Sequence, residues 1–186
     1  IGIGLPIEAL RVQVAVFQRP MEMAASHRIF VDTAAGLFCR PFGPGRTLVG
    51  VGGGDQHDPV DPDGFDPRND LAYPDLARSV MTKRFPAFAG ASYLNGHACL
   101  YDMTPDGHPI LGAAGPDGLF LAAGFSGAGF KKGPAIGEDL ADLILNGASS
   151  TVYLHPFRLD RFTTDAWHAP WSANEYDLGA DFGHGI

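Results

Sequence analysis

The sequence predicts an α+β fold in which a largely antiparallel sheet is followed by one strand–glycine turn–helix unit. Three observations carry this prediction. Short strand-like runs dominate the chain before residue 104, and a glycine-rich segment, SGAGFKKG, separates an apolar run from a helical pattern. The 186 residues, 45% of them apolar, suffice for an ordinary core, and 25 glycines with 15 prolines favour a loop-rich mixed chain.

The predicted sheet begins at residues 10–16, where apolar and polar side chains alternate as in a half-exposed strand. Residues 28–32 and 37–40 form two further short apolar runs. Gly43-Pro44-Gly45 predicts a hairpin turn into a strand over residues 46–51. Because these runs are connected by short turns, we expect them to pair in antiparallel fashion.

The segment 55–68 is rich in Asp and Pro and predicts a solvated surface loop. A metal site, and with it an Asp/His metallohydrolase, is the alternative that its side chains raise: Asp55, His57, Asp58, Asp61 and Asp63. A calcium loop needs a defined ligand spacing with a terminal Glu, and Pro59 and Pro62 interrupt any such spacing. We therefore expect no metal here.

The second part of residues 70–84 predicts a helix, which Pro86 stops. Residues 92–103 then predict a strand. Asp106-Gly107 marks a turn, and residues 108–111 begin another short strand.

A strand, a glycine turn and a helix follow in succession. Residues 118–125 read as a short buried strand, and residues 126–133 as the turn. Pro134 occupies the place of a first helical residue. One helical face then carries the apolar positions Ile136, Leu140, Leu143 and Ile144, and Asn146-Gly147 ends the pattern.

This arrangement predicts a binding site above the glycine turn. Free backbone N–H groups and the positive end of the helix dipole favour an anion, or a ring that becomes anionic. Glycines allow a flat cofactor to approach the backbone closely. The turn is not a dinucleotide fingerprint, because the glycine after Gly127 and Gly129 stands at Gly133, one residue too far along.

Composition excludes several classes of function. The net charge is −8 and no block of Lys or Arg is present, which argues against nucleic-acid binding. No apolar run approaches the roughly 20 residues that a membrane helix needs. Two cysteines, Cys39 and Cys99, are too few for a disulfide scaffold and favour a reducing, cytoplasmic setting.

Two motifs resemble the C-terminal part of the FAD-dependent amine and amino-acid oxidoreductases: CLYDMTPDGHPILG, and GFSGAGFK followed by GPAIGEDLADLI. This is the superfamily of D-amino-acid oxidase, glycine oxidase and sarcosine oxidase, and the chain is most similar to monomeric sarcosine oxidase-like members. The resemblance implies part of a substrate-binding domain over residues 1–104 and the C-terminal segment of an FAD-binding domain over 105–162. Residues 163–186 are expected to form a C-terminal tail, for which no resemblance to the family is seen.

The resemblance also implies FAD as cofactor and a missing segment. Family members begin with a G-x-G-x-x-G strand–turn–helix that binds the ADP part of FAD, and this sequence contains no such segment. We therefore expect the chain to be part of a longer or nicked protein whose N-terminal FAD-binding segment is covalently joined or a separate chain.

Cys99 and Tyr101 carry chemistry by resemblance. Cys99 matches the cysteine that binds FAD covalently in monomeric sarcosine oxidase, although many relatives lack it and a small buried thiol is the alternative. Tyr101 matches a tyrosine that lines the substrate pocket of sarcosine oxidase, where glycine oxidase has a carboxylate-binding arginine. A half-buried structural aromatic is the alternative.

Lys131 matches a lysine that helps to bind the substrate carboxylate in sarcosine oxidase, and a surface lysine without such a role is the alternative. We expect Lys131 and Tyr101 to be the catalytic residues. Lys132 serves as the solvated neighbour of Lys131. The oxygen-activating lysine of sarcosine oxidase is replaced near Val49, so oxidase and dehydrogenase both stay open. Ala128 departs from a histidine that is frequent in the family. The residues expected to bind the cofactor are Cys99, Gly127, Ala128, Gly129, Phe130 and Lys131.

The expected reaction is hydride transfer to FAD from the carbon beside the nitrogen of a small amine or amino acid, followed by hydrolysis of the imine. A non-catalytic binding or interaction domain that kept this fold is the alternative of another class. An upstream G-x-G-x-x-G segment would distinguish the two.

Overall fold

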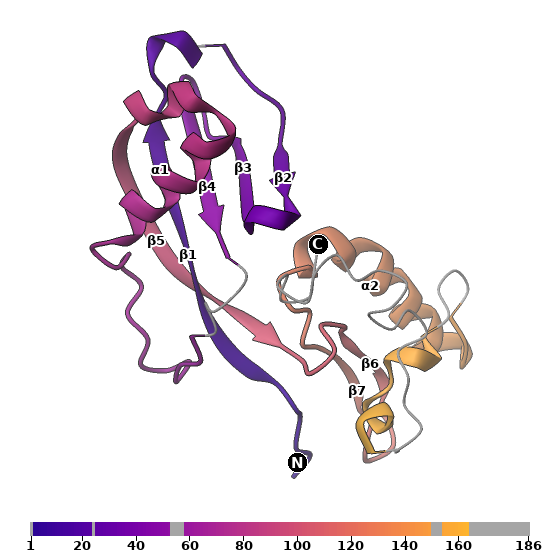
Figure 1. The fold of residues 1–186 in the computed structure, drawn as a ribbon. Helices are drawn as coiled ribbons and strands as arrows, with labels where there is room; N and C mark the ends of the chain where they lie inside the picture. The colour runs from indigo at the N-terminus through magenta and orange to yellow at the C-terminus, as the bar shows by residue number, and fades with distance from the viewer. Residues whose placement is uncertain (1, 24, 53–57, 150–153, 164–186) are drawn as a thin grey trace. The chain divides into compact units, whose positions relative to one another are not determined.

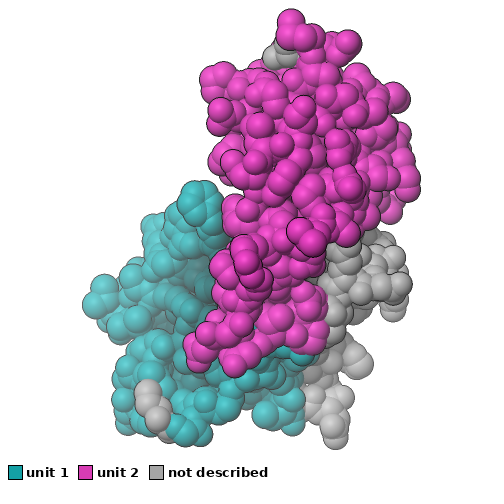
Figure 2. All heavy atoms as spheres, turned by 90° about the vertical axis from the view of Figure 1, so that its left-hand side faces the viewer, with its two compact units in different colours: residues 1–9, 101–177, 183–186 teal, residues 10–100, 178–182 magenta. Residues whose placement is uncertain are grey.

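The computed structural model describes residues 2–23, 25–52, 58–149 and 154–163. These residues fall into two compact units, coloured separately in Figure 2. We call residues 10–100 the sheet unit, and residues 2–9 with 101–163 the helix unit.

Five strands make the sheet, in the spatial order β2-β3-β4-β1-β5 (Figure 1). The pairs β1–β4, β2–β3 and β3–β4 are antiparallel, with Val16 opposite Leu48 and Cys39 opposite Val49. The predicted antiparallel sheet is therefore confirmed. Its strands are β1 (Glu8–Gln18), β2 (Phe30–Asp32), β3 (Leu37–Pro41), β4 (Arg46–Val51) and β5 (Ser92–Met103).

Helix α1 (Tyr73–Arg84) lies across one face of this sheet (Figure 1). Its buried side chains Tyr73, Ala77 and Met81 belong to the same core cluster as β-strand residues such as Phe17 and Val49. The Phe17 ring also meets Phe88 edge to face, with centroids 5.3 Å apart. Ala15 and Phe17 of β1 and Leu37 and Cys39 of β3, alternate residues of their strands, supply the apolar face beneath α1. In β1 this is the side of the strand that also carries Arg11 and Gln13, so the alternation over residues 10–16 predicts the strand but not its core-facing side.

The acidic loop is largely exposed where the structure describes it, and Arg11 is one of the residues that anchor it to the sheet. Arg11 of β1, whose side chain is 8% exposed, donates hydrogen bonds to the carbonyls of Asp66 and Arg68 and to the Asp70 carboxylate. Asp55 and His57 lie outside the described residues. Within the described ranges no group of three or more metal-ligating side chains is found.

The helix unit is built from an antiparallel pair, β6 (Ile110–Ala113) and β7 (Phe120–Ala123), and the helix α2 (Gly129–Asn146). Leu111, Ile136 and Leu154 form its buried core, against which Phe125, Leu140, Leu143 and Phe157 pack. Gly147 adopts a φ of 76° and donates its N–H to the Leu143 carbonyl, so the predicted end of the helix is confirmed.

The predicted start of α2 is wrong. The helix begins at Gly129, and Pro134 lies inside it. A proline within the first turns removes a single intrahelical hydrogen bond, and here this cost does not prevent residues 129–133 from being helical. The glycine turn is therefore shorter than expected. The β7 strand is also less buried than predicted, since none of its four residues is fully buried.

None of the helices in the described ranges has both the length and the apolar character that crossing a membrane requires.

Candidate functional site

A left-handed turn connects β7 to α2. Gly124, Ser126 and Gly127 have φ values of 66°, 51° and 78°, and Ser126 is the one non-glycine residue with positive φ among the described residues. Asp102 of β5 fixes the turn, because its carboxylate accepts the Phe125 N–H at 2.9 Å and its carbonyl accepts the Ser126 N–H at 3.2 Å. The end of β5 and the turn are thus directly bonded.

Tyr101 lies against this turn. A Cβ atom on Gly127 would lie 2.7 Å from Tyr101 Cε2 and 2.8 Å from Cζ, distances that real Cβ atoms do not reach. Gly127 is therefore required both for its φ and for the close approach of the ring. The structure brings Tyr101 to the turn, as the expected site requires.

Helix α2 begins directly after this turn, at Gly129. Ala128 precedes the helix and makes no side-chain cap, and Lys132 is the first residue whose N–H reaches back to the Ala128 carbonyl, at 3.2 Å. The amides of Gly129, Phe130 and Lys131 therefore have no acceptor within the helix. Together with the helix dipole they favour negative charge at this end.

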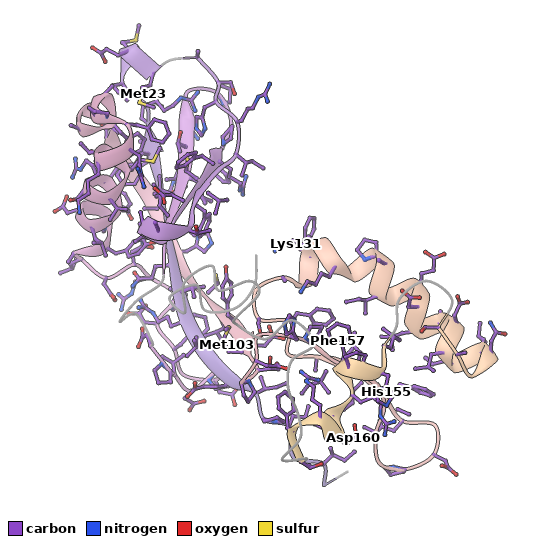
Figure 3. All side chains as sticks on the ribbon, turned by 45° about the vertical axis from the view of Figure 1, so that its right-hand side comes forward. Met23, Met103, Lys131, His155, Phe157 and Asp160 are labelled. Atoms are coloured by element: carbon purple, nitrogen blue, oxygen red, sulfur yellow. The ribbon has the colours of Figure 1, made fainter. Side chains whose placement is uncertain are left out.

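Two lysines follow in the first turn of α2. Lys131 is exposed, and Figure 3 shows it at the beginning of the helix. Lys132 is partly buried, and burial lowers the pKa of its ammonium, with the neighbouring charge of Lys131 acting in the same direction. A fully solvated Lys132 is therefore not what the structure has, since residue 132 lies toward the packed side of the helix.

Cys99 lies two residues before Tyr101 on β5 and belongs to the sheet unit, whereas Tyr101 belongs to the helix unit. It is a free, partly buried cysteine, and burial raises the pKa of its thiol. Val49 is fully buried in the core beneath α1 and supplies no charge. The residues that the structure brings together are Tyr101, Gly127, Ala128, Gly129, Phe130 and Lys131.

The turn and the start of α2 combine three features that bear on ligand binding. The amides of Gly129, Phe130 and Lys131 have no acceptor within the helix, the missing side chain of Gly127 makes room for the Tyr101 ring, and the Lys131 ammonium belongs to the same helix turn. Backbone donors, a nearby cation and a flat aromatic wall suit a planar ring that takes up negative charge.

Sequence reasoning missed the residues that support this turn, chiefly Asp102, Thr104, Asp106, Ser126 and Arg161. Asp106 stands in an Asp-Gly pair, a turn signal that could have identified its backbone contacts. Arg161 gives no such signal, because its ionic partner Asp106 is 55 residues away in the chain.

The profile of the DAO family, described as FAD dependent oxidoreductase, matches residues 1–143. The chain is 30% identical over 169 residues to FAD-dependent oxidoreductase domain-containing protein 1 of Xenopus laevis, which covers 87% of this chain and 32% of that protein. It is 40% identical over 81 residues to monomeric sarcosine oxidase of Streptomyces avermitilis, which covers 42% of this chain and 20% of the relative.

Among solved structures, L-proline dehydrogenase from P. horikoshii is similar with a TM-score of 0.73 and 25% identity, over 88% of this chain and 42% of that chain. The chain thus spans about a third or less of the length of the two curated relatives. The family match covers most of both units. The chain belongs to the DAO family of FAD dependent oxidoreductases, whose cofactor is FAD.

Proposed function

We propose that the chain forms the substrate domain and flavin-facing end of an enzyme that oxidises a C–N bond of a small amine or amino acid of the sarcosine, glycine or D-amino-acid type. The supporting observation is the contact of Tyr101 with Gly127 beside the open first turn of α2. When bound, FAD would supply the redox chemistry: it would accept the electron pair of the C–H bond beside the nitrogen as hydride, and water would hydrolyse the resulting imine.

Lys131 is the proposed group for the substrate carboxylate. Its ammonium is exposed at the start of α2, where the helix amides already favour negative charge. A carboxylate bound by a cation at this end would be held beside the Tyr101 ring, which we propose as a wall of the substrate pocket. The same positive field would stabilise negative charge that develops on the cofactor.

Cys99 is the proposed point of covalent attachment of FAD. The chemistry needs a thiolate, and burial raises the pKa of this thiol in the chain alone. Attachment therefore requires a base or a positive field that assembly with the rest of the protein provides. FAD held by non-covalent contacts is the alternative. Both cysteines are free, in keeping with a reducing, cytoplasmic setting.

An N-terminal FAD-binding segment, covalently joined or a separate chain, is the proposed partner. The side of α2 away from its core exposes Phe130 completely and leaves Leu145 78% exposed, next to the half-exposed Ile144. Large apolar side chains that a helix leaves exposed, here at both of its ends, favour packing against another element. The share of the relatives that this chain spans leaves room for such a segment.

A non-catalytic binding domain is the second candidate. Ala128, at a position where the family often has histidine, supports it, because an alanine contributes no donor to the site. This candidate predicts that protein from the natural source contains no flavin.

The test of the enzymatic proposal is anaerobic titration of the protein from its natural source with sarcosine, following the loss of flavin absorption. Lys131→Ala should raise the sarcosine concentration for half-reduction by roughly tenfold or more, because a charge-assisted hydrogen bond is lost. For a secondary amine without a carboxylate, the same substitution should change the concentration for half-reduction little. The matched control is Lys83→Ala, which removes an exposed lysine of α1. Equal effects on the two substrates would contradict the assignment.

A further inference from the structure

A buried polar network connects the closing segment of the described chain to the glycine turn. The short 3₁₀ helix Leu159–Thr163 contributes Arg161 to it, and the preceding one, His155–Phe157, contributes the Phe157 carbonyl. The Arg161 and Asp106 side chains are 3% and 5% exposed, so their ion pair is enclosed. A buried pair of this kind persists when further hydrogen bonds satisfy its remaining donors and acceptors.

Arg161 uses its whole donor set within the helix unit. Its Nε and Nη2 bond the two oxygens of Asp106, at 2.9 and 3.2 Å. Its Nη1 donates to the carbonyls of Phe157 and Arg158, at 2.6 and 3.1 Å, and Nη2 also donates to the His108 carbonyl at 2.8 Å. These contacts account for all five guanidinium N–H groups. No lysine could reproduce this geometry.

Asp106 passes this constraint to the turn at residues 104–108. Its Oδ1 accepts the His108 N–H and lies 3.0 Å from the Thr104 hydroxyl. Burial alone would raise the pKa of Asp106, but the hydrogen bonds and charge of Arg161 and the bond from His108 outweigh it and lower the pKa. Asp106 therefore stays ionised, and together with the His108 carbonyl, which accepts from the same hydroxyl at 2.8 Å, it orients Thr104.

Thr104 in turn contacts the one strained residue of the glycine turn. Its N–H donates to Ser126 Oγ at 3.2 Å, and its hydroxyl lies 3.3 Å from the same oxygen. Ser126 is fully buried with a φ of 51°, a left-handed conformation that costs a non-glycine residue on the order of 1–2 kcal/mol. A Cβ atom on Gly124 would also lie only 2.4 Å from the Thr104 methyl carbon.

We propose that Arg161 is a positioning residue: its bonds to Asp106 hold Ser126, through Thr104, in the left-handed conformation that directs the first amides of α2 outward. The role in the turn follows from contacts within the chain. Its consequence for the flavin rests on the proposed function. The hydroxyl of Ser126 stabilises its own unfavourable φ, so glycine at this position would remove both the strain and the need for the network.

The test is a double-mutant cycle on the 186-residue chain, with Arg161→Gln, Ser126→Gly and the two combined, read by amide hydrogen exchange. The matched control is Arg158→Gln, which removes an exposed arginine of the same segment paired with exposed Asp160. If Arg161→Gln leaves the helix unit unfolded, Arg161→Lys replaces it in the cycle, because lysine keeps the charge.

With serine at 126, loss of Arg161 should speed exchange at the Ser126 and Ala128 amides by roughly tenfold or more. With glycine at 126, loss of Arg161 should alter the exchange rates of these two amides by less than about threefold, because no strained conformation then depends on the network. The Arg158→Gln control should leave both amides unchanged. Equal acceleration with serine and with glycine would overturn the proposal.

A second readout separates this inference from the proposed function. In FAD-containing protein, Arg161→Lys should shift the visible absorption band of the flavin, and adding Ser126→Gly should restore it. Coupling in the exchange data without any spectral change would support the positioning role and contradict flavin contact at this turn. A spectral change without exchange coupling would overturn the positioning role.

Discussion

Replacing Gly127 by alanine tests the close contact on which the site is built. The new Cβ would lie 2.7 Å from Tyr101 Cε2, and the backbone would have to keep a φ of 78°. The left-handed backbone costs an alanine about 1–2 kcal/mol. Pushing a ring out of a packed position typically costs a further 1–3 kcal/mol or so. Gly127→Ala should therefore lower the free energy of unfolding of the helix unit by about 2–5 kcal/mol.

The assay is urea unfolding followed by circular dichroism, with the NMR signals of the Tyr101 ring as a local probe. Gly133→Ala is the matched control, because nothing lies within 4 Å of its Cβ position and the residue is helical. It should be neutral or stabilise by up to about 1 kcal/mol.

A third variant separates the two costs. Tyr101→Ala removes the ring, so adding Gly127→Ala to it should cost only the backbone share of about 1–2 kcal/mol. The reasoning is refuted if Gly127→Ala costs no more than Gly133→Ala, or if the Tyr101 ring signals are unchanged.

Three further predictions concern charge, the thiol and the exposed helix face. The pKa of Asp106 is lower in the folded than in the unfolded chain, so its ion pair with Arg161 stabilises the fold at neutral pH. This stabilisation is lost as the pH falls through the folded pKa. Asp106→Asn should therefore lower the free energy of unfolding by about 3–5 kcal/mol at pH 7, and urea unfolding should show that the stability of the variant depends less on acid pH. Cys99→Ser should make all flavin extractable on a denaturing gel, and flavin that stays attached would show that Cys99 is not the link. Leu145→Ser should weaken association with the N-terminal segment in a pull-down, whereas Glu138→Gln, a substitution of an exposed polar residue on the same helix, should not. Equal binding by Leu145→Ser would count against that face as the interface.

Much of the fold could be predicted because its determinants are local. The alternation in β1 and the Gly-Pro-Gly turn before β4 specify strands and a hairpin through neighbouring residues alone. The stop at Gly147 is equally local, since it depends on a single left-handed residue. Pro134 gave a wrong start for α2 for the same reason. Proline usually stands in the first turn of a helix, and the local sequence does not show that this helix already begins at Gly129.

The support of the site could not be predicted, because it is made by residues far apart in the chain. Tyr101 and Gly127 were expected at the site individually, but their contact depends on the pairing of β5 with the turn through Asp102. The link from Arg161 to Ser126 passes through two intermediate residues and leaves no periodic pattern. The burial of Lys132 likewise depends on how α2 packs, which spacing alone does not determine.

The most direct test of the account is the visible spectrum of the protein from its natural source, before and after addition of a small N-methyl amino acid without oxygen. We predict a flavin spectrum that bleaches on addition. A flavin spectrum that no small amine or amino acid bleaches, or protein without flavin, would contradict the claim that this chain forms the flavin-facing end of an amine-oxidising enzyme.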